Sequence, residues 1–283
     1  YRPNIVFHAA AYKHVHLMQD NIDEAITNNV LGTKQLFDSV ARHNIPRFTF
    51  ISTDKVVNPT SVMGATKKLC EYYIDATRTP TTTCNIVRFG NVINSNGSVL
   101  PLFERQIAQH RYVTVTHAGM QRFFMSIREA AQLVIESTIE ERDNAVHLLN
   151  MGELINVHDV AISLIRSKNL LPNIDVNVQI TGLRKGEKLI EELYTETESA
   201  HLTPTKDNRM FSLEGDKASL FDIHQVIAEL QESIVTDGNG DQIRTTLKRL
   251  FPSLQLSTNG SYLSASANTA SSLSPSTTSS NTR

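Results

Sequence analysis

The chain has 283 residues, of which 40% are hydrophobic and 20% charged, a composition typical of a globular protein with one large domain or two smaller ones. Its 27 basic and 29 acidic residues give a formal net charge of -2, which argues against a basic nucleic-acid-binding face and against a polybasic membrane-surface protein. Two cysteines, Cys70 and Cys84, exclude a disulfide framework, and without a membrane-spanning apolar stretch or a signal peptide the sequence predicts a cytoplasmic enzyme or binding module.

Apolar runs alternate with helical periodicities along the first third of the chain. A buried strand is expected from residue 5 to residue 9, leading into a loop of small residues, and a helix is expected over 22–40. The strand 48–51, the helix 62–78 and the strand 85–89 follow. Unbroken apolar runs are typical of parallel strands that are covered on both faces. The pattern therefore predicts an α/β fold with a doubly wound, Rossmann-like parallel sheet.

The second half of the chain is less regular. Helices are expected over 99–110, 127–141 and 156–167, with short strands at 113–116 and 147–150. We interpret this part as a smaller mixed α/β lobe that does not repeat the first sheet.

The first turn of a dinucleotide-binding sheet is missing. Such a sheet begins with a strand followed by Gly-x-Gly-x-x-Gly, and the only Gly-x-Gly here is at 238–240, with no strand before it and Ile243 in the place of the third glycine. Because the first strand begins at residue 5, we expect an N-terminally truncated chain that lacks the first βαβ unit and, by itself, binds a dinucleotide poorly.

The densest group of reactive side chains follows the strand 48–51. Asp54 and Lys55 would point to opposite faces of a strand, so they can act on one ligand only past the strand end, where the following Asn-Pro predicts a turn. Met63 and Lys67 are four residues apart on the next helix and share a face. In isolation, an Asp–Lys pair is more often a surface ion pair than a catalytic one.

Five motifs in order give this pair its context. They are His8-Ala-Ala-Ala-Tyr-Lys13-His14-Val15, residues 28–33, 52–67, 88–92 and 182–188. Over residues 3–215 the chain resembles the UDP-N-acetylglucosamine 4,6-dehydratase family of polysaccharide biosynthesis, a branch of the extended short-chain dehydrogenase/reductases. The resemblance implies a nicotinamide dinucleotide cofactor (NAD or NADP, with NAD favoured), a UDP-sugar such as UDP-N-acetylglucosamine as substrate, and no metal. It also implies assembly into oligomers through helices that flank the sheet.

The resemblance implies a role for each reactive side chain. Hydride leaves C4 of the sugar, water is lost across C5 and C6, and the hydride returns to C6. Lys55 would be the base at C5, with a pKa lowered partly by Lys67, and Asp54 the acid at the C6 hydroxyl. Thr53 would hydrogen-bond the C4 oxygen, and Lys67 would hold the nicotinamide ribose.

Met63 departs from the superfamily pattern, which has tyrosine at this position. A thioether cannot usefully accept the C4 hydroxyl proton. Either the site is degenerate, or the chain belongs to the methionine-containing subgroup, in which Asp54 or Lys55 takes over as base. The intact neighbouring motifs favour the subgroup, whose members are often fused to an N-terminal membrane-spanning region.

Further contacts are assigned from the resemblance alone. Arginines suit the pyrophosphate because their guanidinium groups donate two hydrogen bonds at once. The cofactor-binding residues would be Ala9, Ala10, Ala11, Lys13, Asn28, Ser52, Lys67 and Arg88. The substrate-binding residues would be Lys13, Asn91, Ser98, Val99, Arg122, Arg184 and Glu187.

The predicted organisation has three parts. Residues 1–95 form a partial NAD(P)-binding Rossmann domain with the catalytic loop, and residues 96–255 form a substrate-binding lobe with helices that complete the fold. Residues 256–283 form a disordered tail, because 15 of its last 27 residues are serine or threonine. Two alternatives stay open: a UDP-sugar 4-epimerase, which would lack the Asp54–Lys55 pair, and a catalytically silent UDP-sugar-binding fragment.

Overall fold

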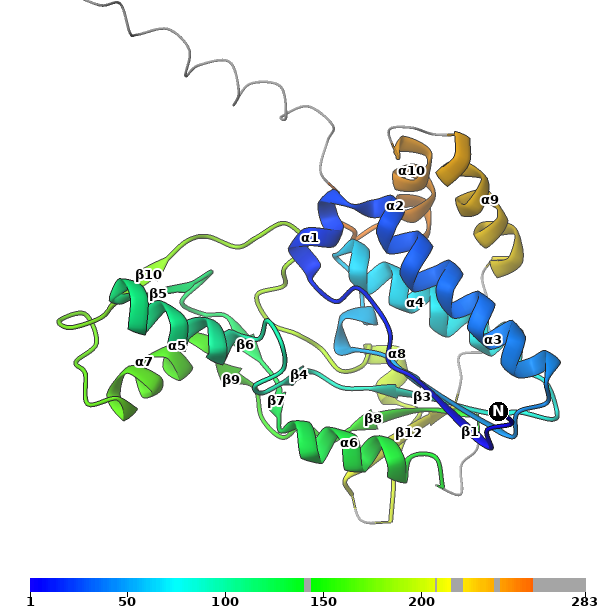
Figure 1. Cartoon of the computed structure of the whole chain (residues 1–283), viewed down its shortest axis with the longest axis horizontal. Coiled ribbons are helices and arrows are strands. Elements are labelled where there is room, and N and C mark those ends of the chain that lie inside the picture. The colour runs from blue at the N-terminus through cyan, green and yellow to red at the C-terminus, as the bar shows by residue number, and fades with distance from the viewer. Residues whose placement is uncertain (140–143, 207, 215–220, 237–239, 257–283) are drawn as a thin grey trace, which may run out of the picture.

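A twisted, mostly parallel sheet forms the larger part of the molecule (Figure 1). The computed structural model describes residues 1–139, 144–206, 208–214, 221–236 and 240–256, and the predicted tail lies outside these ranges from residue 257 onward. Within them the sheet has the strand order β1-β2-β3-β8-β12-β11. The parallel strands are β1 (Ile5–His8), β2 (Arg47–Ile51), β3 (Thr83–Arg88) and β8 (Ala145–Leu149), and the antiparallel strands are β12 (Met210–Glu214) and β11 (Leu202–Pro204).

Helices cover the two faces of this sheet (Figure 1). Consecutive residues of β3 enter different cores, because strand side chains alternate between faces: Ile86 shares a core with Leu69 of α4, and Val87 shares one with Leu133 of α6. This burial on both sides explains the unbroken apolar runs and confirms the predicted doubly wound fold class. The covering helices are α3 (Gly32–Arg42) and α4 (Val62–Ala76) on one face and α6 (Ile127–Glu136) on the other. Helices α9 (Ile223–Thr236) and α10 (Asp241–Leu250) pack on the outer side of the first of these helix layers.

The first strand differs from its prediction. Ile5 is 39% exposed and Phe7 44% exposed, whereas the side chains that alternate with them are more deeply covered. The prediction of a fully buried strand is wrong here because β1 lies at the edge of the sheet.

The predicted helix 22–40 contains an irregular turn. It forms as α2 (Ile22–Ala25), a π-helical segment η1 (Ile26–Leu31) and α3, which continues to Arg42. Short π-helical turns occur often at functional sites. Here the turn contains Asn29, whose side-chain oxygen accepts a hydrogen bond from the Tyr12 backbone N–H at 2.7 Å and whose amide donates to Thr66 Oγ1 at 3.1 Å. The turn therefore ties the loop after β1 to α4.

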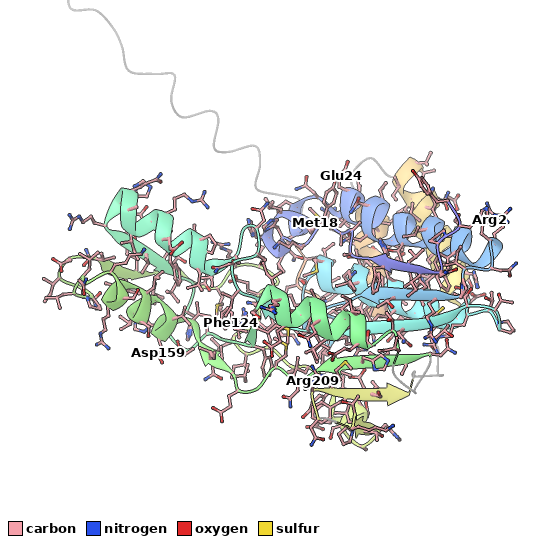
Figure 2. The ribbon with its side chains drawn as sticks, turned by 60° about the horizontal axis from the view of Figure 1, so that its bottom comes forward. Arg2, Met18, Glu24, Phe124, Asp159 and Arg209 are labelled. Carbon is pink, nitrogen blue, oxygen red and sulfur yellow. The ribbon has the colours of Figure 1, made fainter. Side chains whose placement is uncertain are left out.

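A smaller lobe lies at one end of the sheet, and its Asp159 is far from Arg2 at the other end of the molecule (Figure 2). Its core gathers side chains from α5 (Val99–His110), α7 (Val157–Ser167), β5 (Tyr112–Val115) and β10 (Asn177–Ile180). The predicted bounds of α5 are confirmed. Two short pairings link the lobe to its surroundings, β4 (Asn91–Val92) with β7 (Phe124–Met125) and β6 (Gln121–Arg122) with β9 (Ile155–Asn156).

One predicted strand of the lobe belongs elsewhere. Residues 147–150 were expected in the lobe, but β8 pairs in parallel with β3 inside the main sheet, and all five of its residues are buried. The prediction was wrong because a short apolar run carries no information about which sheet it joins. The sheet therefore takes strands from both sides of residue 95.

The last described residues return to the loop after β2. The Gln255 backbone N–H donates to the Thr60 carbonyl oxygen at 2.9 Å, and Ser253 Oγ donates to the Pro59 carbonyl oxygen at 3.0 Å. Gln255 Oε1 also accepts from the Gly186 N–H at 3.2 Å. Residues 253–255 thus join the loop after β2 to the segment around Gly186. None of the helices in the part of the chain described is long and apolar enough to cross a membrane.

Candidate active site

A cavity of about 460 Å³ opens where the carboxyl ends of β1, β2 and β3 face the smaller lobe. Phe124 of β7 is among its lining residues and lies where the two parts of the molecule meet (Figure 2). Of the residues predicted for the site, the cavity brings together Ala9, Ala11, Lys13, Ser52, Thr53, Lys55, Met63, Lys67, Asn91, Ser98, Val99, Arg122, Arg184 and Glu187.

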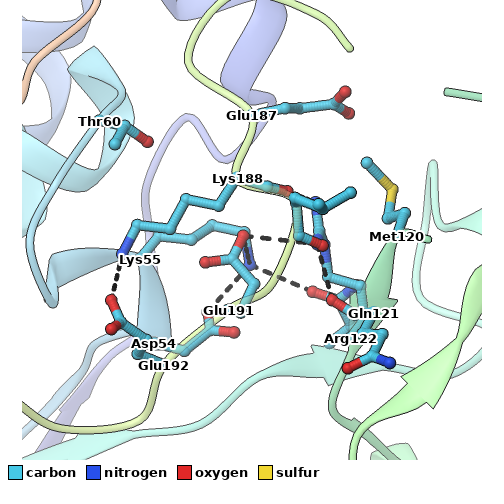
Figure 3. Close-up of polar contacts among 12 residues, drawn as sticks. Asp54, Lys55, Thr60, Met120, Gln121, Arg122, Glu187, Lys188, Glu191 and Glu192 are labelled. Carbon is cyan, nitrogen blue, oxygen red and sulfur yellow. Dashed lines mark hydrogen bonds and ion pairs between the residues drawn. The ribbon is translucent and has the colours of Figure 1, made fainter. Parts of the chain in front are cut away.

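The Asp54–Lys55 pair lies in a turn beyond the end of β2, as predicted. The strand ends at Ile51, and a single 3₁₀ turn (η2, Asp54–Val56) begins directly afterwards. Lys55 Nζ donates to Asp54 Oδ1 at 2.9 Å and to Asn91 Oδ1 at 3.2 Å. Thr53 Oγ1 also donates to Asp54 Oδ1, at 2.9 Å. The turn therefore directs the ammonium group of Lys55 back onto its neighbouring carboxylate, at the wall of the cavity (Figure 3).

Helix α4 packs directly on this turn. Ser61 caps the helix by accepting a hydrogen bond from the Gly64 N–H at 3.1 Å. A Cβ atom added at Gly64 would lie 2.2 Å from the Lys55 carbonyl oxygen, so only glycine fits this contact without a shift. The glycine thus allows α4 to approach closely enough to place Met63 and Lys67 at the cavity.

The pKa of Lys55 is shifted in the direction opposite to the prediction. Burial acts to lower its pKa, but the carboxylates of Asp54 and Glu191 raise it by more, and the net shift is upward. Arg122, not Lys67, is the cation that acts to lower the pKa of Lys55. The prediction of a lowered Lys55 pKa with help from Lys67 is therefore wrong, because two carboxylates face the amine.

Lys67 has the lowered pKa instead. Its side chain is buried, and Nζ lies 3.7 Å from the centroid of the Phe50 ring and donates to the Ile51 carbonyl oxygen at 2.5 Å. Burial lowers the pKa of Lys67 to about 8. Met63 lies one turn earlier on the same face of α4, is 5% exposed, and lines the cavity beside it.

We expect this buried amine to make stability depend on pH. An unfolded lysine titrates near 10.4, so the folded chain gains roughly 2–3 kcal/mol of stability as pH rises from about 8 to about 10. Lys67→Met should lack this gain, so the free energy of unfolding of the variant relative to the parent should fall across that window. Urea unfolding at both pH values measures it. Lys168→Met is the control, because the Lys168 side chain is 39% exposed, and a constant difference between Lys67→Met and the parent would contradict the prediction.

Four predicted site residues lie outside the cavity lining. Neither Ala10 nor Asn28 is part of the lining. Asn28 donates a hydrogen bond to Asn29 Oδ1 at 3.0 Å, and it is Asn29 that contacts the loop after β1. The Asp54 side chain is fully buried behind Lys55, and its Oδ2 has no hydrogen-bond partner among the residues that the structure describes.

Arg88, the fourth of these residues, belongs to a buried ion-pair network beneath the cavity. Its guanidinium group contacts Glu71 at 2.7 Å and Glu198 of the short helix α8 (Glu196–Ser199) at 2.8 Å. Ser52 Oγ donates to Glu71 Oε1 at 2.6 Å. In this arrangement Arg88 supports Ser52 through Glu71, and a contact of Arg88 with a cofactor stays a prediction.

Sequence reasoning missed Glu191. It lies in an extended segment three residues after the motif 182–188, where no periodicity marked it. The structure buries it to 4% exposure at the cavity, with Oε1 3.8 Å from Lys55 Nζ and 3.7 Å from Arg122 Nε (Figure 3). The glutamate pair in Ile190-Glu191-Glu192 was the available signal, but the pattern does not say which of the two glutamates is buried.

Two arginines, Arg122 and Arg184, line the cavity. The Arg122 guanidinium group donates to the backbone carbonyl oxygens of Lys188 at 2.8 Å and Leu189 at 3.2 Å. Glu187 Oε2 accepts from the Arg184 N–H at 3.0 Å, which shapes the loop that brings both residues to the cavity. Among the described residues, no three His, Cys, Asp or Glu side chains gather in the geometry of a metal site. The arrangement suits proton transfer beside a bound anion.

Comparisons with known proteins agree with this geometry. The family described as "Polysaccharide biosynthesis protein" matches residues 1–213. The capsular polysaccharide biosynthesis protein CapD of Staphylococcus aureus is 44% identical over 200 residues, which are 70% of this chain and 33% of CapD, so the chain spans about a third of that relative.

Solved structures show the same fold. Pen from Bacillus thuringiensis superposes with a TM-score of 0.70 and 32% identity, over 77% of this chain and 67% of Pen. UDP-glucose 4-epimerase from Thermus thermophilus, in complex with NAD, superposes with a TM-score of 0.60 and 18% identity, over 71% of this chain and 72% of the epimerase. The match over residues 1–213 and the likeness to CapD and Pen show that this chain belongs to the family of polysaccharide biosynthesis proteins.

Proposed function

We propose that the protein removes water across C5 and C6 of UDP-N-acetylglucosamine, acting as a UDP-sugar 4,6-dehydratase in polysaccharide biosynthesis. The observation that carries this proposal is the adjacent Asp54–Lys55 pair at the cavity wall, with Nζ and Oδ1 2.9 Å apart. An elimination needs an acid and a base close together, and a hydrogen bond of this length would let the two groups share a proton.

The cavity suits a nicotinamide dinucleotide, for which we favour NAD. The small side chains of Ala9 and Ala11 leave room at the end of β1, and Lys67, whose ammonium group donates to the Ile51 carbonyl oxygen at the cavity, is the residue that we assign to the ribose hydroxyls. The structural neighbour from T. thermophilus binds NAD on the same fold. When bound, the cofactor supplies hydride acceptance at C4 of the sugar and hydride return at C6.

The two reacting side chains have complementary tasks. Transfer of the proton from Lys55 Nζ to Asp54 Oδ1 leaves a neutral amine and a neutral carboxyl group. Because Met63 cannot accept a proton usefully, the neutral Lys55 amine first takes the C4 hydroxyl proton and passes it to solvent. Lys55 then accepts the C5 proton, and Asp54 donates its proton to the departing C6 hydroxyl. Once C6 has been reduced, Lys55 returns its proton to C5, and Asp54 regains a proton from solvent. We assign the pyrophosphate to Arg122 and Arg184, which both line the cavity, because guanidinium groups suit phosphate oxygens.

Incubation of the protein with UDP-N-acetylglucosamine and NAD in deuterated water tests the proposal. We expect a product that has lost one water and carries deuterium at C5, measured by mass spectrometry and NMR. An unchanged mass with inversion at C4 would contradict the proposal and support the epimerase alternative. No change to the sugar by protein that calorimetry shows to be loaded with NAD would contradict both and leave a UDP-sugar-binding protein.

A further inference from the structure

We propose that Glu191 is a positioning residue that holds Lys55 against Asp54 and sets how readily the lysine amine gives up its proton. Glu191 has no part in the steps described above. The effect of Glu191 on catalysis rests on the proposed dehydratase function, but its effect on the titration of Lys55 does not.

The geometry places one carboxylate oxygen between two cations. Glu191 Oε1 is 3.8 Å from Lys55 Nζ and 3.7 Å from Arg122 Nε (Figure 3). The side chains of Glu191 and Arg122 are 3% and 7% exposed, so little water screens these charges. Lys55 is therefore held from two sides, by Asp54 at 2.9 Å and by Glu191.

The backbone around Glu191 is fixed by the smaller lobe. The Gln121 N–H donates to the Leu189 carbonyl oxygen at 2.9 Å, and Gln121 forms a parallel bridge with Ile190. Arg122 donates to the Lys188 and Leu189 carbonyl oxygens. The carboxylate thus reaches Lys55 from a rigid segment of another part of the chain.

The charges around Lys55 balance only when Glu191 is included. Asp54 and Glu191 carry two negative charges, and Lys55 and Arg122 carry two positive ones. The nearby Lys188 amine is engaged elsewhere, with the Val57 carbonyl oxygen at 2.8 Å and Glu192 at 2.9 Å. Loss of the Glu191 charge would leave an excess positive charge facing Lys55, which favours the neutral amine.

The unpaired oxygens of this group argue against a purely structural ion pair. Glu191 Oε2 and Asp54 Oδ2 are both buried, and neither has a hydrogen-bond partner within the described part of the chain. Buried polar atoms are normally satisfied, and exceptions are often found at functional sites. Two half-satisfied carboxylates that face one ammonium group fit a site that moves protons.

The variant Glu191→Gln tests the inference, with Glu192→Gln as its matched control. Glu192 is the neighbouring residue, its side chain is 49% exposed, and it pairs with Lys188 instead of Lys55. Competitive acetylation with acetic anhydride across a pH series, read by mass spectrometry of the Lys55 peptide, reports the titration of this amine without requiring activity. Lys55 lines the cavity and its side chain is 19% exposed, so the reagent can reach it.

We expect the labelling midpoint of Lys55 to fall by at least about one pH unit in Glu191→Gln and to stay at the parent value in Glu192→Gln. Glu191→Asp should restore part of the shift. Arg122→Gln should move the midpoint in the opposite direction, so a second variant remains if Glu191→Gln does not fold. Equal Lys55 midpoints in the parent and Glu191→Gln, or no rise in a folded Arg122→Gln, would overturn the inference.

Activity separates this inference from the proposed function. If water elimination occurs, the acid limb of its pH profile should move to lower pH in Glu191→Gln and stay in place in Glu192→Gln. A shifted Lys55 midpoint in a protein that never eliminates water would sustain the role of Glu191 and refute the dehydratase.

Discussion

Replacing Asp54 by asparagine should lower kcat for water elimination by about 10²- to 10⁴-fold, the range typical for loss of a general acid or base. Asparagine keeps the size of the side chain, but its amide group cannot donate the proton that the departing C6 hydroxyl needs. It also cannot take the proton from Lys55, whose Nζ lies 2.9 Å from Asp54 Oδ1.

The Asp54→Asn substitution should affect kcat and KM to different extents. Asp54 is fully buried behind Lys55, so KM for the UDP-sugar should change much less than kcat. Asp159→Asn is the control, because the Asp159 side chain is 76% exposed and lies in the smaller lobe. Steady-state kinetics that showed kcat of Asp54→Asn within tenfold of the parent would remove Asp54 from the acid role.

Replacing Arg88 by methionine should reduce the free energy of unfolding by about 3–5 kcal/mol, because it leaves two buried carboxylates without their cation. The Arg88 side chain is 2% exposed and contacts both Glu71 and Glu198. Arg249→Met removes the same kind of side chain from a pair with Glu229 in which Arg249 is 59% exposed, and should cost less than about 1 kcal/mol. Urea unfolding of the two variants measures the contrast, and equal losses would show that the network contributes no more than a surface pair.

The Arg88 network should also determine how the free energy of unfolding decreases at acidic pH. Burial raises the pKa of Glu71, but Arg88, Lys68 and two hydrogen bonds lower it by more, to about 2. An ordinary glutamate titrates near 4.3, so the contribution of Glu71 is complete above about pH 5 and is lost as pH falls toward about 2. In Arg88→Met this loss should be smaller, and acid unfolding curves of the two proteins should converge at low pH.

Features that depend on residues close together in the sequence were predicted correctly. The bounds of α5 followed from its periodicity, and the position of Asp54 beyond β2 followed from the strand end and the Asn-Pro turn. In both cases the determining residues are neighbours in the sequence.

Long-range arrangement was harder to predict. The pairing of β8 with β3 and the burial of Glu191 depend on contacts between residues far apart in the chain, for which a single sequence has no signal. The pKa of Lys55 was predicted in the wrong direction for the same reason, because the second carboxylate lies 136 positions away. The π-helical turn at Asn29 was missed because its cause is the hydrogen bonding of that side chain to Tyr12 and Thr66.

The contact of residues 253–255 with the loop after β2 should influence local unfolding around the cavity. Thr60 and Gly186, on two walls of the cavity, share Gln255 as a hydrogen-bond partner. This residue follows α10, which lies beyond the part of the chain matched by the family. The hydrogen-bonded amides of Gly186 and Gln255 should therefore exchange with solvent together, as one cooperative unit whose opening is governed by the packing of α9 and α10.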